Sequence, residues 1–153
     1  MKLSERQTAA GRSGLTGLIF LGLCVLLSAC TMGSPGADIG RQVVDNYYQA
    51  LQQENVDADA LMEYFSDNRA PEVWRSHLKN IRKSLGKVDT FEYKGKEVNT
   101  VFSGRFYIFE YQVNYDSGKG AKETLTLFDS VDSDDQPKIV SHVIAAEGFE
   151  PIF

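Results

Sequence analysis

Two histidines and one aspartate are the side chains in this sequence best suited to acid–base chemistry. His77, His142 and Asp45 stand far apart in the chain, and imidazole titrates near neutral pH, where general acids and bases work. His77 borders a helical apolar stripe, and His142 alternates with the apolar residues Val140 and Ile144. We interpret both histidines as hydrogen-bonded packing residues and Asp45 as solvated. The alternative is a catalytic base inside a ligand cavity.

Other chemical motifs in the sequence are incomplete. Asp132, Asp134 and Asp135 begin like a calcium loop, but Pro137 stands where the turn glycine belongs and no glutamate closes the loop. There is no G-x-S-x-G motif and no phosphate-binding glycine loop. We therefore expect no metal and no other cofactor, and we interpret the aspartates as an acidic hairpin tip.

Several aromatic side chains could either fill a core or line a pocket for a lipid-like small molecule. Aromatic residues at such spacings belong to a core more often than to a pocket. The residues concerned are Tyr47, Tyr48, Phe65, Trp74 and Tyr107.

Both cysteines lie within the first 30 residues. Lys2, Arg6 and Arg12 precede an uncharged run over residues 15–27, which is shorter than the roughly 20 apolar residues that a membrane-spanning helix needs. A positive start followed by a short apolar run predicts an export leader.

The end of this leader, Leu27-Ser28-Ala29-Cys30, resembles the bacterial lipoprotein signal. The resemblance implies a leader over residues 1–29, cleavage before Cys30 and a lipid on the Cys30 thiol. It also implies a membrane-bound protein in the cell envelope. By the same resemblance, Thr31 in place of an aspartate favours the inner leaflet of the outer membrane, facing the periplasm.

Removal of the leader would leave 124 residues with 13 basic and 20 acidic side chains, a formal net charge of about −7. This length suits one domain with one core, and the acidic balance argues against nucleic acid as a partner. No cysteine follows Cys30, so the domain has to fold without disulfides. We predict a flexible tether over residues 30–37 and a single domain over 38–153.

The first half of this domain has helical periodicity. Helices are predicted over 38–54 with Asp38 as its cap, over 57–65 from a cap at Asp57, and over 71–85 between Pro71 and Gly86. The apolar residues expected to face the core are Ile39, Val43, Tyr47, Leu51, Leu61, Met62, Phe65, Trp74, Leu78, Ile81 and Leu85.

The third predicted helix also carries a basic patch, formed by Arg75, Lys79, Arg82 and Lys83. The patch is either a solvated helix face or a contact for anionic headgroups, glycan or an acidic protein partner. The sequence leaves both interpretations open.

The second half has the period of two that is typical of strands. Strands are predicted over 88–101, with Gly95 as a bulge or turn, and over 105–115, 122–131 and 138–146. In the second strand one face is aromatic from Tyr107 to Tyr115, and the opposite face is half apolar through Phe106 and Ile108. The expected fold class is α+β, with N-terminal helices packed on one face of a curved four-stranded antiparallel meander.

The order of these elements, with the segments 54–65, 73–88 and 111–127, resembles the nuclear transport factor 2-like, or cystatin-like, superfamily. The resemblance covers residues 38–147 and implies a cone-shaped sheet around a helix. Some members are isomerases or dehydratases that use an Asp, often with a His, in that cone, and others only bind proteins or form dimers.

We favour a non-catalytic domain that binds an envelope protein or other envelope component. The alternatives are a lipid-like small-molecule binder or cone-type enzyme, and a structural homodimer formed through the sheet face of Phe106 and Ile108.

Overall fold

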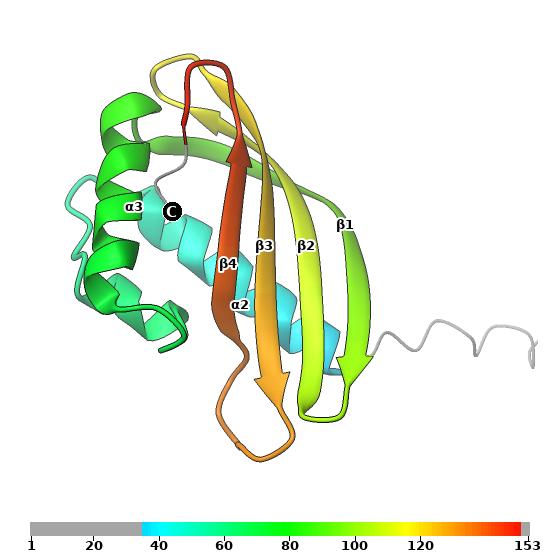
Figure 1. The fold of residues 1–153 in the computed structure, drawn as a ribbon. Coiled ribbons are helices and arrows are strands. Elements are labelled where there is room, and N and C mark those ends of the chain that lie inside the picture. Colours follow the sequence, from blue (N-terminus) through cyan, green and yellow to red (C-terminus); the bar gives the residue numbers. More distant parts are fainter. Residues whose placement is uncertain (1–34, 151–153) are drawn as a thin grey trace, which may run out of the picture. The chain divides into compact units, whose positions relative to one another are not determined.

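A computed structural model describes residues 35–150, which form an α+β fold with helices packed on a curved antiparallel sheet (Figure 1). The predicted fold class is confirmed. The elements are α2 (Pro35–Leu51), the 3-10 helix η2 (Ala60–Tyr64), α3 (Pro71–Ser84), β1 (Val88–Val101), β2 (Gly104–Tyr115), β3 (Gly120–Ser130) and β4 (Lys138–Ala145). The predicted leader and Cys30 lie outside the described residues. No helix in residues 35–150 is long and apolar enough to cross a bilayer.

Helix α2 begins three residues before the predicted start. Pro35 suits a first helical turn, where backbone N–H groups have no partner within the helix. Gly36 lies against Tyr107, and Ala37 is fully buried. The predicted tether is therefore wrong for residues 35–37, and Asp38 lies within the first turn instead of capping the helix.

The buried face of α2 is centred on Val44 and Tyr48 as well as on the predicted Val43 and Tyr47. Ile39, predicted to face the core, is 47% exposed. A strict spacing of four drifts around a helix of 3.6 residues per turn, so the first residue of the predicted stripe leaves the core side.

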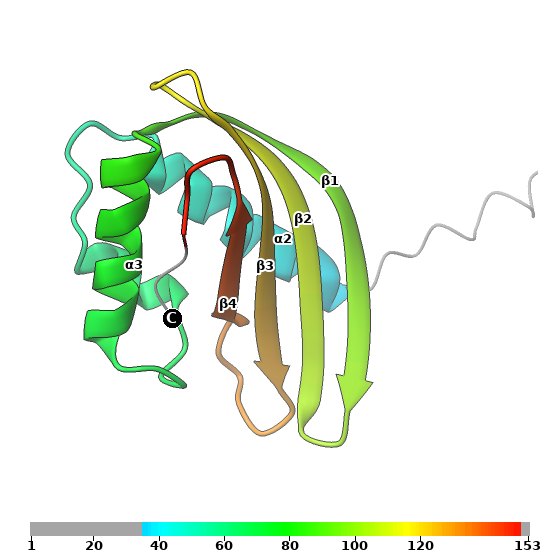
Figure 2. The same cartoon turned by 45° about the horizontal axis from the view of Figure 1, so that its top comes forward.

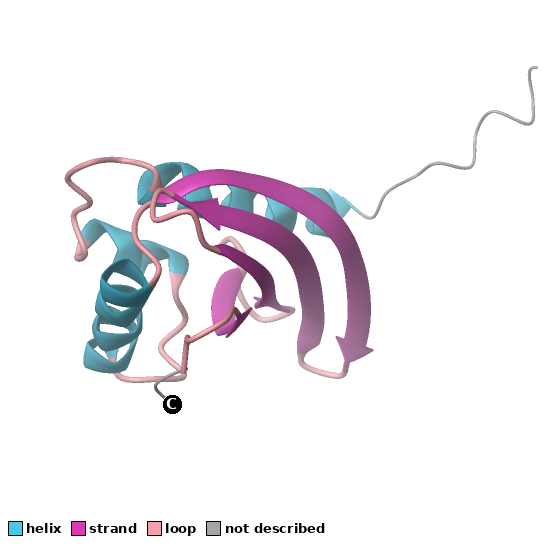
Figure 3. Cartoon of the chain, turned by 90° about the horizontal axis from the view of Figure 1, so that it is seen from above, coloured by secondary structure: helices cyan, strands magenta, loops and turns pink. Residues whose placement is uncertain are grey.

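The four strands pair in chain order, and each pair is antiparallel. Figures 2 and 3 show how the sheet curves, with α2 packed along its inner face. The inner face of β2 is buried from Tyr107 to Tyr115, as predicted, and Phe106 and Ile108 on the other face are half-buried. The register shift at Gly95 confirms the predicted bulge.

A register shift between β3 and β4 corrects one predicted face. Ile139 pairs with Leu127, but Ser141 already pairs with Thr126. The extra residue reverses the alternation, because successive side chains of a strand point to opposite faces. His142 is buried as expected, but it shares the core face with Ile139 and Ile144 and not with Val140.

Helix α3 ends where the sequence predicts, at a glycine in a left-handed conformation. Gly86 has φ = +102°, and a Cβ atom there would come within 2.2 Å of the Asp116 carboxylate. That carboxylate accepts a hydrogen bond from the Lys87 amide at 2.8 Å. Gly86, the second residue after α3, is thus fixed by its conformation and by its contact with Asp116.

We predict that Gly86→Ala lowers the free energy of unfolding by about 2 kcal/mol, because the side chain is strained at positive φ and displaces Asp116. Gly95→Ala is the control, since no atom lies within 4 Å of its Cβ position. Urea unfolding measures both variants, and equal losses of stability would contradict the prediction.

Candidate functional site

The two histidines that are far apart in sequence meet in the core. His77 of α3 and His142 of β4 are each 4% exposed. His77 Nε2 lies 3.3 Å from His142 Nδ1, and the Tyr47 hydroxyl lies at the same distance from that nitrogen. His142 Nε2 lies 2.8 Å from Glu123 Oε2.

Glu123 of β3 is the centre of this cluster and is fully buried. Its carboxylate accepts hydrogen bonds from the Tyr48 hydroxyl at 2.9 Å, from the Tyr115 hydroxyl and from His142. These three donors come from α2, β2 and β4, so one carboxylate links the helix to the sheet. We call the six residues the Glu123 network: Tyr47, Tyr48, His77, Tyr115, Glu123 and His142.

The hydrogen bonds of this network are mutually consistent. With its proton on Nε2, His142 donates to Glu123, and its Nδ1 accepts from His77 or Tyr47. Burial, and then the charge of Glu123, raise the pKa of Tyr47 and Tyr115 well above 10, so both hydroxyls remain donors. Within residues 35–150, no buried side-chain nitrogen or oxygen lacks a hydrogen-bond partner.

The network is enclosed. The described residues form one groove beside α3 and another beside the loop after β3, and neither histidine lines either of them. A general base has to lie within hydrogen-bond reach of a substrate proton, directly or through one water. In the described structure both histidines instead contact protein groups, and aromatic rings pack around them, Tyr47 against His142 and Trp74 and Phe149 against His77. These contacts join α2, α3, β3 and β4 to one another.

Asp45, the third predicted acid–base residue, belongs to a different contact. Its carboxylate accepts a hydrogen bond from the Tyr111 hydroxyl at 2.6 Å and lies 3.6 Å from the Arg41 guanidinium. Burial, followed by Asp45, raises the pKa of Tyr111 well above its ordinary value. Asp45 is therefore partly buried and paired, and the structure does not bring it to the histidines.

The first groove has a volume of about 740 Å³ and lies where the end of α2, the following loop, α3 and the start of β1 meet. This size is within the range of small-molecule sites. Its apolar lining residues are Leu51, Val56, Leu61, Leu78, Ile81 and Val88. We call it the α3 groove.

Charged side chains surround the α3 groove. Arg75, Lys79 and Arg82 of the predicted basic patch line it on one side, and Glu54 and Asp57 line it as well. The remaining member of the patch, Lys83, is not among the lining residues, because it lies one step further around the helix from the buried stripe.

Ion pairs distinguish these cations from one another. Arg75 lies 2.8 Å from Asp59, and Glu54 lies 2.6 Å from Lys87. Lys79 and Arg82 are exposed, and neither has an ion-pair partner within the described part of the chain. Two cations thus remain available beside an apolar floor.

The predicted aromatic pocket residues lie mainly in the core. Tyr47, Tyr48 and Tyr107 are fully buried, and Trp74 stacks on Phe65 with ring centroids 4.3 Å apart. Of these five, Phe65 lines a second groove of about 460 Å³ beside the loop after β3, and none lines the α3 groove.

The described residues contain no group of three or more His, Cys, Asp or Glu side chains placed to hold a metal ion. The acidic residues 132–135 form an exposed turn in which Ser133 Oγ donates to Asp135 at 3.0 Å. Expectations about cofactors remain predictions.

Sequence reasoning missed Glu123, the central residue of the network. A signal for it exists, because Ala121, Glu123, Leu125 and Leu127 alternate on one face of β3 and all are buried. A single carboxylate within an apolar strand face indicates a buried acid that needs donors. The sequence of β3 alone does not show which residues donate to Glu123.

The pH dependence of stability should report the environment of His77. Burial, followed by His142 and Arg69, lowers the pKa of His77 from 6.5 to about 3. Between these values the unfolded chain binds a proton at this site and the folded chain does not. The free energy of unfolding should therefore fall as pH drops from about 6.5 to about 3, by up to about 1.4 kcal/mol per pH unit from this group.

Urea unfolding across this pH range measures the slope. His77→Gln keeps a donor for His142 Nδ1 and removes the titration, so its slope should be shallower than that of the wild type. A variant that kept the full slope would show that His77 is not the group responsible.

Removal of the Glu123 carboxylate should leave three buried donors without their acceptor. We expect Glu123→Ala to lower the free energy of unfolding by about 3–5 kcal/mol. Glu110→Ala is the matched control, because Glu110 lies on the outer face of the sheet, 46% exposed and 3.1 Å from Lys122. Its loss should stay below about 1 kcal/mol. Thermal and urea unfolding would refute the assignment if the two variants behaved alike.

Comparisons with known proteins give no family. No protein-family model and no curated protein matches the sequence. Among solved structures, the Bdellovibrio bacteriovorus protein Bd1075 is 15% identical with a TM-score of 0.47, and the match covers 72% of this chain and 40% of that protein. This chain therefore spans about two fifths of that protein's length. A de novo designed β-sheet protein solved by NMR is 20% identical with a TM-score of 0.39, over 74% of this chain and 90% of the design.

Proposed function

We propose that this protein is a lipid-anchored envelope protein whose domain binds a partner without catalysis, through the α3 groove. The observation that carries the proposal is the combination of apolar lining residues with two cations, Lys79 and Arg82, that have no ion-pair partner among residues 35–150. Such a surface suits a partner that is both apolar and acidic.

The cations follow the axis of α3. Lys79 and Arg82 lie one turn apart, and Arg75, which is itself paired with Asp59, extends this row to about 10 Å along the helix. A row of this length fits acidic side chains repeated along a protein segment better than the single headgroup of a small amphiphile. We therefore propose an amphipathic, acidic segment of an envelope protein as the occupant.

The titratable residues of the core support a non-catalytic role. His77, His142 and Glu123 contact one another and neighbouring aromatic side chains, and none of them lines the α3 groove. The residues best suited to acid–base chemistry are thus engaged in packing, while the groove offers apolar and charged contacts.

The location of the protein is part of the proposal. The lipoprotein-like sequence that ends at Cys30 supports a lipid anchor and a periplasmic domain on the inner leaflet of the outer membrane. The order of helices and strands supports the affiliation with the nuclear transport factor 2-like superfamily.

Charge reversal in the groove tests the proposal. The full chain, expressed in its native host, is crosslinked in the envelope, captured, and its partners are identified by mass spectrometry. We expect a reproducible protein partner whose capture falls about tenfold with Lys79→Glu or Arg82→Glu, because a favourable charge contact becomes repulsive. Lys83→Glu is the matched control, since it makes the same charge change on the same helix outside the groove.

Absence of any reproducible partner, or equal capture by Lys79→Glu and Lys83→Glu, would contradict the proposal. Recovery of an anionic amphiphile in place of a protein would favour the small-molecule alternative. Association of the chain with itself, lost on substitution of Phe106, would favour the homodimer.

A further inference from the structure

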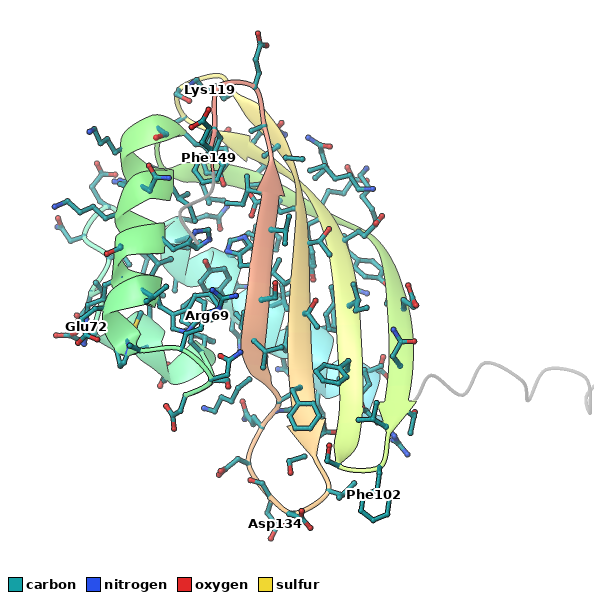
Figure 4. All side chains as sticks on the ribbon, in the orientation of Figure 1. Arg69, Glu72, Phe102, Lys119, Asp134 and Phe149 are labelled. Carbon is teal, nitrogen blue, oxygen red and sulfur yellow. The ribbon has the colours of Figure 1, made fainter. Side chains whose placement is uncertain are left out.

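Two turns at one end of the sheet present an apolar tip made of Val101, Phe102 and Val131. Phe102 is completely exposed, Val131 is 69% exposed and Val101 is 43% exposed. The Val131 amide donates to the Ser103 carbonyl at 3.1 Å, which holds the β1–β2 turn beside the end of β3. Figure 4 shows the Phe102 side chain pointing away from the domain. Within residues 35–150 the Phe102 side chain is wholly uncovered, and Val131 and Val101 are partly covered.

The apolar tip lies at the end of the sheet where α2 begins. Gly36, in the first turn of α2, packs against the Tyr107 hydroxyl, and Tyr107 stands three residues from the start of β2. Figure 1 shows the first turn of α2 near that end of β1 and β2. Cys30 precedes Pro35 by five residues, which span at most about 17 Å when fully extended.

We propose that the apolar tip docks on the lipid surface that holds Cys30, an inference that rests on the proposed lipid anchor. The tip is convex and consists of three side chains, so it is too small for a specific protein interface, which buries about 800 Å² on each partner. A fluid lipid surface needs no complementary shape. The short chain between Cys30 and Pro35 raises the local concentration of lipid at the tip, so that a contact that is weak alone becomes effective.

The charges beside the tip select the kind of lipid. Asp132, Asp134 and Asp135 follow Val131 directly, and Figure 4 shows Asp134 at the same end of the domain as Phe102. These carboxylates repel anionic headgroups at short range, whereas Arg105 is the exposed cation next to the turn. The tip therefore fits a surface of zwitterionic phospholipid.

This orientation leaves the α3 groove accessible. Val88, at the start of β1, lines the groove, and Val101, at the end of the same strand, belongs to the tip. Val88 and Val101 are the first and last of the fourteen residues of β1, whose length along the curved strand is at most about 43 Å. A domain that stands on its tip presents the groove to the periplasm.

Fluorescence quenching by lipids tests the proposal. The processed full chain is placed in vesicles of phosphatidylethanolamine and phosphatidylcholine, with or without brominated acyl chains. The wild type contains a single tryptophan, the buried Trp74, which supplies the background. Phe102→Trp should lose about half of its added fluorescence to the brominated lipid, as expected for a ring at the headgroup and acyl boundary. Lys119→Trp is the control, because Figure 4 shows Lys119 at the opposite end of the sheet.

The mass of the peptide that contains Cys30, taken from the same preparation, reports the anchor separately. A lipid on Cys30 together with quenching confined to F102W would support the proposal. With the lipid present, F102W quenched no more than K119W would overturn the docking of the tip alone. F102W that is unquenched by lipid but shielded from aqueous acrylamide would assign the tip to a protein contact and would also overturn it. An unmodified Cys30 would overturn the anchor and this orientation together.

Discussion

The Glu123 carboxylate, fully buried among apolar and aromatic side chains, is the constraint around which the domain is organised. A buried carboxylate is costly unless donors surround it. Here the donors come from α2, from β2 and from β4, and β4 in turn contacts α3 through the two histidines. Four elements, β3 itself and α2, β2 and β4, therefore have to reach their native positions for this one side chain to be satisfied. We infer that this requirement fixes the placement of α2 on the sheet, and that the contact between His77 and His142 adds α3.

The same network is the reason why we place the proposed function outside the core. The histidines, which are the residues best suited to acid–base chemistry, are committed to internal hydrogen bonds, and desolvation holds the pKa of His77 far below neutrality. Residues available for recognition are those that the core does not use. They are the cations beside the α3 groove and the apolar tip, at opposite ends of β1.

These two surfaces form one coherent arrangement. In the proposed arrangement, the lipid anchor brings the tip end of the sheet toward the lipid, and the groove lies at the other end of β1. The glycine at position 36 contributes, because a side chain there would collide with the Tyr107 hydroxyl and would move α2 off the sheet at the end nearest the predicted anchor. The geometry of the domain thus relates the proposed anchoring and the proposed binding to one another.

The sequence by itself determined the class of every helix and strand described, because helix and strand periods are local properties of the chain. The structure confirms the 88–101 strand, the bulge at Gly95, the aromatic face of β2 and the stop at Gly86.

Tertiary structure alone decided which polar side chains meet, because His77, Glu123 and His142 are brought together across 65 residues by strand pairing and helix docking. It also decided that Ile139 and not Val140 shares the core face with His142, since one extra residue in β4 shifts the alternation, and that Lys79 and not Lys83 borders the groove. These facts depend on contacts between distant segments, and no local period encodes them.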